Sequence, residues 1–305
     1  MIGSSTAAFY DRAGSDLGRL RRQAERLQGQ IATGDRLHRP SDDPIAAARL
    51  RTLSRQHAFA GIDRQAADRA TIQLSNTAST LGELASTVIR ARELAMQGAT
   101  STASAETRRI IGNEMAALFK TTLAFANSGD GQGAALFGGT APAPAYAPSA
   151  TGATYQGAAE PPMLDLGDGQ NVRAGLIGPE VFALDPETSG GSPDLFAALR
   201  SLADALQSGD AANLPLVQKG ISALDQGLER ITAAQTHAGA RLTHVETVTN
   251  VQNARADTRL EEQSRIGGAD LAATISELQQ TMTVLEASQA SFVRLSGLSL
   301  FEMLR

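Results

Sequence analysis

Apolar residues alternate at spacings of three and four at both ends of the chain. Near the N-terminus the stripe contains Leu17, Leu20, Leu27 and Ile31. Near the C-terminus it contains Ile275, Leu278, Met282, Leu285 and Phe292. Such spacing places the apolar side chains on one narrow face of a helix, in the pattern of a coiled coil. The pattern therefore predicts a long helix at each end of the chain.

Turn and capping residues separate the N-terminal helix from the next one. Gly34 follows the last apolar position and suits a helix C-terminus. The segment Arg39-Pro40-Ser41-Asp42-Asp43-Pro44 comes next. Pro40 disfavours helical geometry at the residue before it, and Asp43 followed by Pro44 is typical of a helix start. We expect a second helix from Pro44 through Ala60 or further.

Helical spacing returns in several later segments. A third helical region is expected to end near Gly98, and a fourth runs from about Ala105 to Ala126. Asp194 is a candidate N-cap for a helix that stops around Gly209. A long helix then begins near Leu214, is interrupted at 267–268, and resumes almost to the C-terminus.

The segment 128–193 loses the helical period and is rich in Gly, Pro, Ala and Thr. It is either a linker or a small β module, and alternation in 163–166 and 171–177 around the Gly-rich turn 167–170 favours the β module. Residues 135–137 and 154–156 are candidates for further short strands. The Pro-Ala run 141–148 is expected to be a loop.

These elements predict a mainly α fold, in which long coiled-coil-like helices from both termini pack as a bundle around a small β-rich insertion. Residues 1–43 and 264–305 would form a terminal coiled-coil assembly region, residues 44–127 and 194–263 a helical rod, and residues 128–193 the insertion domain. Aromatic residues are only 4% of the 305, and Trp is absent, so the stripes bury little area. We hypothesise that the two ends pair antiparallel and become ordered only when neighbouring subunits add more apolar surface.

Composition and charge exclude several function classes. With no cysteine, disulfides and thiolate chemistry are excluded. The net charge of -5 argues against nucleic-acid binding, because the N-terminal arginines are interleaved with acids such as Glu25, Asp35 and Asp42. Neither a secretory signal nor an apolar run of membrane-spanning length is visible. We therefore expect no nucleic-acid partner, no membrane insertion and, if the protein leaves the cell, export without a cleaved signal peptide.

Candidate catalytic and metal-binding residues also have simpler interpretations. His237 and His244 lie two helical turns apart near Glu246, whereas metal-binding pairs on helices usually have a spacing of four. Asp42 and Asp43 are explained by capping of the helix that follows. We predict no catalytic residue, no metal and no cofactor, and conclude that the protein is not an enzyme.

The segment 31–49, with Arg39, Pro40, Ser41, Asp42, Asp43 and Pro44 at its centre, resembles the N-terminal signature of the bacterial flagellin superfamily, most closely its hook-associated protein 3 branch. The C-terminal run Leu298-Ser299-Leu300-Phe301-Glu302-Met303-Leu304 is similar to the end of hook-associated chains. Shorter matches, such as 136–140 and 178–182, lie in the expected order between the two ends.

This resemblance implies a structural subunit that forms a ring at the junction between flagellar hook and filament, outside the cell. Its partners would be further copies of itself, hook-associated protein 1, flagellin and a cytoplasmic export chaperone that binds the C-terminal helix. The subunit would leave the cell through the flagellar type III apparatus. The assembly interface would comprise the two terminal stripes together with Leu298, Leu300 and Phe301.

Two alternatives remain at this stage. A filament flagellin would share the helical termini and differ mainly in copy number and neighbours. A helical nucleic-acid-associated protein that uses the arginine-rich N-terminal helix is a more distant alternative. Salt-dependent DNA binding by the purified chain would favour the second.

Overall fold

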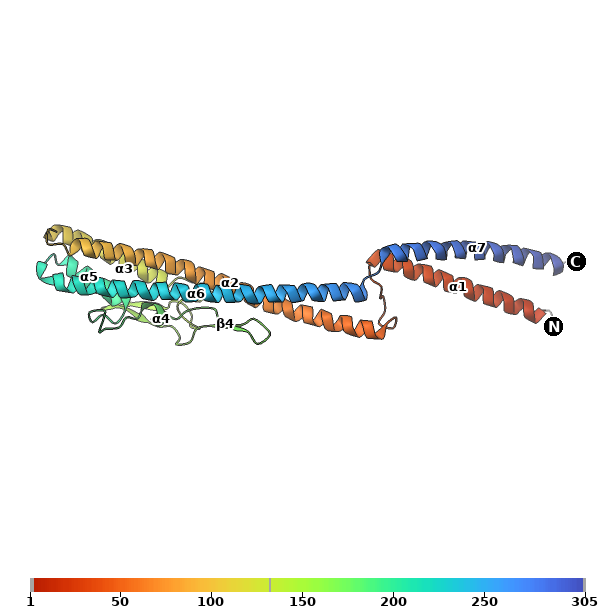
Figure 1. Cartoon of the computed structure of the whole chain (residues 1–305), viewed down its shortest axis with the longest axis horizontal. Helices are drawn as coiled ribbons and strands as arrows, with labels where there is room; N and C mark the ends of the chain where they lie inside the picture. Colours follow the sequence, from red (N-terminus) through yellow and green to blue (C-terminus); the bar gives the residue numbers. More distant parts are fainter. Residues whose placement is uncertain (1–2, 132, 304–305) are drawn as a thin grey trace. The chain divides into compact units, whose positions relative to one another are not determined.

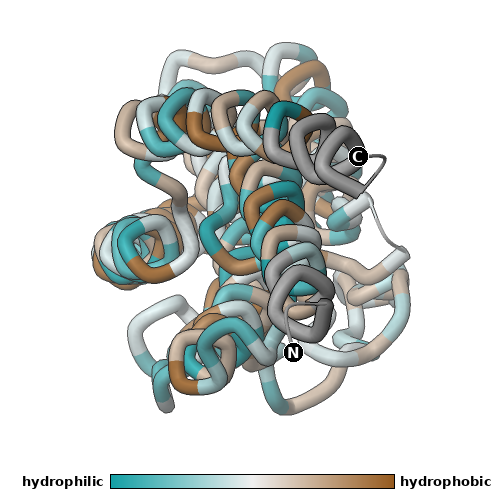
Figure 2. The backbone as a smooth tube through the Cα atoms, turned by 90° about the vertical axis from the view of Figure 1, so that its right-hand side faces the viewer, coloured by the Kyte–Doolittle hydropathy of each residue, from teal (hydrophilic) through white to brown (hydrophobic). Residues whose placement is uncertain are grey.

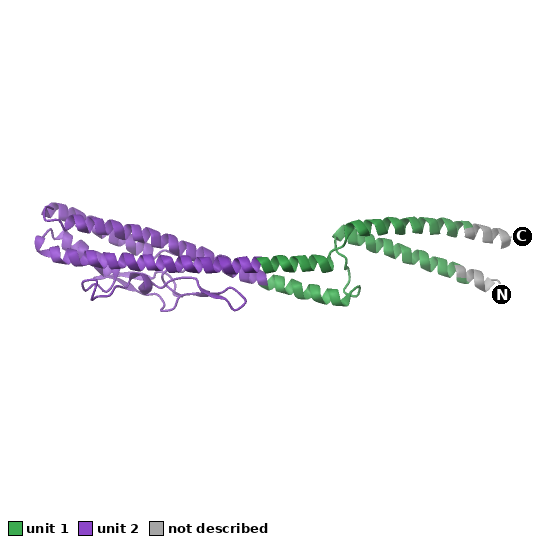
Figure 3. Ribbon diagram, in the orientation of Figure 1, with its two compact units in different colours: residues 1–59, 254–305 green, residues 60–253 purple. Residues whose placement is uncertain are grey.

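The computed structural model describes the backbone of residues 3–131 and 133–303, and the side chains of residue 8 and of residues 10–131 and 133–294. The predicted fold class is confirmed, because long helices dominate and the strands form only two-stranded sheets. The chain forms two compact units, residues 1–59 with 254–305 and residues 60–253 (Figure 3). The domain limits expected from the sequence stay a prediction.

The first unit contains the two terminal helices. Helix α1 spans Gly3–Thr33 and helix α7 spans Leu271–Met303. They lie side by side and run antiparallel, as the sequence pattern predicts (Figure 1). Hydrophobic stretches are interspersed with hydrophilic ones along the helices (Figure 2). Only part of each helix surface can therefore pack against the other helix.

Helices α2, Pro44–Gly98, and α6, Leu214–Gly267, contribute to both units. The expectation of two separate helical regions in this part of the chain is wrong, because α2 continues through Gly61. A glycine inside a helix costs about 1 kcal/mol relative to alanine, and one such cost does not break a helix of 55 residues. The expected break at 267–268 is confirmed, since α6 ends at Gly267 and α7 begins at Leu271.

The second unit is a helical bundle. Helices α3, Ala105–Ala126, and α5, Leu195–Gln207, pack together and against α2 and α6. The short 3-10 helix η1, Ala211–Asn213, precedes α6. Capping confirms the predicted start of α5, because the Asp194 carboxylate accepts a hydrogen bond from the Ala197 amide at 2.7 Å. The largest buried side chains of the bundle include Leu81, Leu84, Met115, Leu199 and Leu202.

The insertion contains two small antiparallel hairpins and the short helix α4, Gly178–Phe182. Strand β1, Tyr146–Ser149, pairs with β2, Gly152–Tyr155. Strand β3, Met163–Asp165, pairs with β4, Asn171–Arg173, with Leu164 opposite Val172. The hairpin predicted around the turn 167–170 is therefore confirmed, although its second strand ends at Arg173 rather than Ile177.

Two local expectations for the insertion are wrong. Residues 135–137 form a turn with an isolated bridge at Ala135, and the expected loop 141–148 ends in strand β1. Asn127 explains the second difference, because its side chain bonds both the amide and the carbonyl of Tyr146, at 2.8 and 2.9 Å. This pairing satisfies the backbone of Tyr146 on the side away from β2.

Aromatic rings attach the first hairpin to the bundle. Tyr146 contacts Phe196 of α5 and Phe182 of α4, with ring centroids 4.8 and 5.4 Å apart. Aromatic pairs in this range stabilise a fold beyond the area they bury. Burial raises the pKa of the Tyr146 hydroxyl. The hairpin is therefore an integral part of the second unit.

The second hairpin packs on α2 and α6 through Leu166 and Val172, which are buried together with Leu74 and Val245. The side-chain amide of Gln252 on α6 donates to the Leu166 carbonyl. Gly167 has φ +83°, and a Cβ at this position would collide with the carboxylate of Asp63. Glycine is thus required both by the turn and by the close approach to α2.

Candidate assembly site

The two terminal helices pack through a narrow seam, which we call the terminal seam. On α1 its buried side chains are Ala24 and Leu27, which are 5% and 2% exposed. On α7 they are Thr274, Thr281 and Leu285, which are 8%, 5% and 7% exposed. These positions repeat at spacings of three, four and seven, so each helix buries one face only.

The residues predicted for assembly occupy different places in this arrangement. Leu27 and Leu285 are buried, and Leu17, Leu20, Ile31, Leu278 and Phe292 are partly buried. The ring of Phe292 meets that of Tyr10 edge-on, with centroids 5.6 Å apart. Ile275 and Met282 instead point away from the seam. Leu298, Leu300 and Phe301 lie outside the residues whose side chains are described.

A second apolar stripe runs along α7 beside the terminal seam. It consists of Leu271, Ile275 and Met282, which we call the outer stripe, and these side chains are 46%, 43% and 36% exposed. Spacings of four and seven place them on one side of the helix. Helix α7 therefore has more apolar surface than α1 covers.

The two segments that join the terminal helices to α2 and α6 meet each other. The Arg36 amide donates to the Gly267 carbonyl at 2.7 Å, and the Ala269 amide donates to the Gly34 carbonyl at 2.8 Å. Asp35 and Gly268 form an antiparallel bridge between these bonds. Gly34, with φ +73°, is the predicted helix terminator and turns the chain into this bridge.

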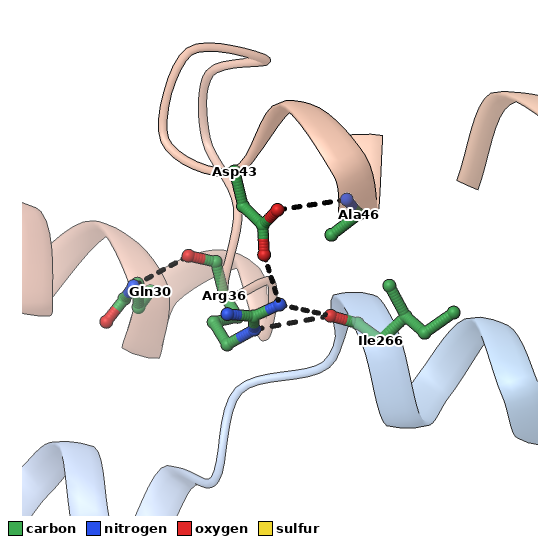
Figure 4. Close-up of polar contacts among 5 residues, drawn as sticks. All are labelled: Gln30, Arg36, Asp43, Ala46 and Ile266. Carbon is green, nitrogen blue, oxygen red and sulfur yellow. Dashed lines mark hydrogen bonds and ion pairs between the residues drawn. The ribbon is translucent and has the colours of Figure 1, made fainter. Parts of the chain in front are cut away.

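The side chain of Arg36 holds the end of α6 (Figure 4). Its Nε and Nη2 atoms donate to the Ile266 carbonyl at 3.2 and 3.0 Å. Nη2 also lies 3.5 Å from Oδ2 of Asp43, and the Gln30 side chain donates to the Arg36 carbonyl at 2.7 Å. The last carbonyls of a helix lack partners within the helix, and the guanidinium supplies one.

The motif Arg39-Pro40-Ser41-Asp42-Asp43-Pro44 forms the turn that precedes α2. The Asp42 carboxylate accepts a hydrogen bond from the Arg39 amide at 2.9 Å. The Asp43 carboxylate accepts one from the Ala46 amide at 3.0 Å, so Asp43 is the N-cap expected from the sequence. This backbone bond, with a smaller contribution from Arg36, lowers the pKa of Asp43.

A bidentate ion pair joins the beginning of α2 to the end of α6. Nε and Nη2 of Arg49 lie 2.7 and 2.9 Å from the two carboxylate oxygens of Glu262. The bond to Arg49 lowers the pKa of Glu262 and raises that of Arg49. Beside this pair is a pocket of about 560 Å³ lined by Asp35, Leu50, Leu260, Ser264 and Gly267, among others. The two linkers, the beginning of α2 and the end of α6 thus line one pocket.

Comparison with known proteins shows that this chain resembles flagellar proteins. Residues 5–141 match the protein family described as the bacterial flagellin N-terminal helical region. The chain is 28% identical over 290 residues to flagellar hook-associated protein 3 of Escherichia coli (strain K12), and the match covers 90% of each protein. Over most of its length the chain is thus similar to flagellar hook-associated protein 3. Flagellar hook-associated protein 3 is a structural flagellar protein and not an enzyme.

Solved structures of hook-associated proteins have the same fold. A flagellar hook-associated protein from Vibrio parahaemolyticus aligns with a TM-score of 0.69 at 17% identity, covering 74% of this chain and all of that one (100%). The flagellar junction protein FlgL from Legionella pneumophila aligns with a TM-score of 0.58 at 15% identity, covering 72% and 99%. At these identities the likeness concerns the fold.

Two other kinds of feature are absent from the described residues of this chain. No three His, Asp or Glu side chains gather as a metal site among the described residues. No described helix is both long and apolar enough to cross a membrane.

Several residues of the candidate assembly site were not recognised from the sequence. Thr274 and Thr281 are buried in the seam, but the stripe was chosen from apolar residues alone. The Thr274 hydroxyl bonds the Asp270 carbonyl at 2.6 Å, which satisfies its polar group and leaves the methyl group to pack. Their spacing with Leu278 and Leu285 was the available signal. Arg36 and the pair Arg49–Glu262 gave no local signal, because their partners are more than 200 residues away.

Proposed function

We propose that this chain is a subunit of the hook–filament junction, and that its copies assemble side by side as a ring through their terminal helices. Its neighbours would be hook-associated protein 1 on the hook side and flagellin on the filament side. The observation that best supports this is the outer stripe, because Leu271, Ile275 and Met282 stay exposed when α1 and α7 are paired.

The energetics of a two-helix pair favour such an assembly. Burial of apolar surface contributes about 25 cal/mol per Å², and the terminal seam buries few large side chains. Isolated helices and hairpins of this kind are marginal in water. A neighbouring copy that covered the outer stripe would add a second packed face to α7. Both the terminal seam and the outer stripe would then be buried.

The segments expected from the sequence would have separate roles in the assembly. Residues 1–43 and 264–305 would form the assembly region. The apolar side chains predicted to pack inside the ring are Leu17, Leu20, Leu27 and Ile31 of α1 and Ile275, Leu278, Met282, Leu285 and Phe292 of α7. Residues 44–127 and 194–263 would form the rod, and 128–193 the insertion domain on its surface. Leu298, Leu300 and Phe301 would extend the interface toward the C-terminus.

We further propose that the subunit is exported through the flagellar type III apparatus and reaches the outside of the cell. A cytoplasmic chaperone would bind the C-terminal helix before export. The exposed apolar side chains of α7 support this, since an unassembled helix with an outer stripe needs a cover in the cytoplasm. Co-purification of a chaperone with the full chain, but not with a chain that ends at Asp270, would test it.

Deletion of the gene, followed by electron microscopy, tests the junction assignment. We expect hooks without attached filaments and flagellin released into the medium, with both restored by the intact gene. Filaments of normal length on the mutant would contradict the proposal. Labelling the protein separates it from a filament flagellin, which would be found along the whole filament rather than at its base.

A further inference from the structure

A pocket in the second unit gathers arginine side chains from the insertion and from α6. Its volume is about 360 Å³, within the range of roughly 300 to 1,000 Å³ that small-molecule sites occupy. Leu176, Ala233 and Ala234 form its apolar lining. The charged and polar side chains around it are Arg173, Glu180, Arg230, His237 and Arg241. We call it the arginine pocket.

The arginine pocket has more positive than negative charge. Nη2 of Arg173 lies 2.7 Å from Oε1 of Glu180, so the one carboxylate is already paired. Nη1 of Arg241 donates to the Gly175 carbonyl at 3.1 Å, which is a neutral partner. Arg230 is exposed and forms no ion pair with any residue that the structure describes. Three guanidinium groups against one carboxylate leave two positive charges without a counter-charge.

The environment of Arg241 disfavours its charged form. Burial, followed by repulsion from Arg173, lowers the pKa of Arg241, and the attraction of Glu180 offsets only part of this. Like charges in a partly desolvated pocket repel each other more strongly than they would in water. A bound anion would offset the repulsion between the arginines and accept hydrogen bonds from the free N–H groups of their guanidiniums.

The positive side chains come from separate elements. Arg173 lies on β4 and Glu180 on α4, in the insertion, whereas Arg230, His237 and Arg241 lie on one face of α6. An anion held between them would connect the insertion to α6. Ligands that bind only the folded form stabilise it in proportion to the logarithm of their concentration.

We propose that the arginine pocket binds a divalent oxyanion of the phosphate or sulfate class, which clamps the insertion onto α6. Two uncompensated charges match a dianion, and tetrahedral oxygens can meet guanidiniums that approach from different elements. The site is independent of the terminal helices. Its failure would leave the junction assignment untouched.

Titration of the full chain with inorganic phosphate, followed by NMR of the Leu176, Ala233 and Ala234 amides, tests the proposal. Ionic strength is held constant with chloride, so that general screening stays the same. We expect saturable shifts at these amides and a higher unfolding temperature of the second unit. A parallel titration with sulfate shows whether the site needs protonatable phosphate or only the double charge.

The variant Arg230→Gln should weaken binding about tenfold, because a charge-assisted hydrogen bond is lost from an exposed residue without a structural partner. Arg64→Gln, on the exposed surface of α2, removes the same charge elsewhere and should leave affinity unchanged. Arg230→Lys keeps the charge and should retain part of the affinity. Shifts that do not saturate, or an equal loss in Arg64→Gln, would overturn the proposal.

Discussion

Arg36 illustrates how one side chain organises a turn between distant segments. Its guanidinium donates twice to the Ile266 carbonyl and also approaches Asp43, while its own backbone pairs with Gly267. A planar group with several fixed N–H donors can serve a carbonyl and a carboxylate together, which an ammonium group does less well. The linkers therefore depend on this residue type rather than on positive charge alone.

Asp43 should make the start of α2 sensitive to acid. Its pKa is depressed in the folded chain, so the folded form binds fewer protons than the unfolded one, and stability is lost as the pH falls through the folded pKa. The protection of the Ala46 amide against hydrogen exchange, relative to an unfolded chain at the same pH, should fall over this range. Asp43→Ala should show fast exchange at every pH, whereas Asp43→Asn should keep the cap and lose the acid sensitivity.

Asp194 should show the opposite dependence on pH. Burial raises its pKa above the usual 3.8, so the folded protein binds more protons and its stability falls as the pH rises from 3.8 through the folded value. Asp194→Ala should lower the free energy of unfolding by about 1 kcal/mol, through loss of the bond to Ala197. Asp194→Asn keeps an acceptor without a charge.

Chemical denaturation at several pH values measures both Asp194 variants. Relative to the natural protein, Asp194→Asn should gain stability as the pH rises above 3.8. A constant difference between these two proteins across that range would show that burial of the charge has no energetic effect. Both variants lie in the second unit and should leave the terminal helices unaffected.

The residues that could be predicted from the sequence are those whose partners are close in the chain. Asp43 and Asp194 cap helices that begin at the next residue, and Gly34 ends the helix before it, so local chemistry was sufficient. Asn127 forms strand β1 from 19 residues away, and the composition of that strand is typical of a loop. Non-local partners of this kind leave no periodic pattern.

At the scale of elements, α7 has two different apolar faces. One contains Leu285 with two threonines and packs on α1, and the other is the outer stripe. The two faces look like one stripe in the sequence, because Leu278 and Leu285 continue the spacing that begins at Ile275. A helix with apolar side chains over such a width is suited to more than one partner.

Leu285→Ala should weaken the pairing of α1 with α7. The side chain is 7% exposed, and removal of a buried leucine side chain costs about 2 kcal/mol or more. Faster amide hydrogen exchange in α1 around Leu27 should report the loss. Val284→Ala, at a neighbouring position that is 44% exposed, is the matched control and should leave exchange in α1 unchanged.

At the scale of the whole molecule, the chain joins segments from its two ends. The Gln23 amide donates to the Glu277 carboxylate at 3.0 Å across 254 residues. Contacts so far apart form only after the intervening chain has closed the loop, which favours late formation of the terminal seam. If α1 and α7 pair late in folding, their apolar faces are still open to a neighbouring copy of the chain before the pair is fully packed.

Substitutions in the outer stripe test whether folding and assembly depend on different faces of α7. Ile275→Ser with Met282→Ser removes apolar surface that α1 does not cover, so the monomer should keep its helix content and unfolding temperature. Incorporation into the flagellum should nevertheless fall, because a neighbouring copy loses the face it would bury. Met163→Ser replaces another exposed methionine, 57% exposed on β3, and should assemble normally. Normal incorporation of the double variant, measured by labelling the hook–filament junction, would show that the outer stripe has no part in assembly.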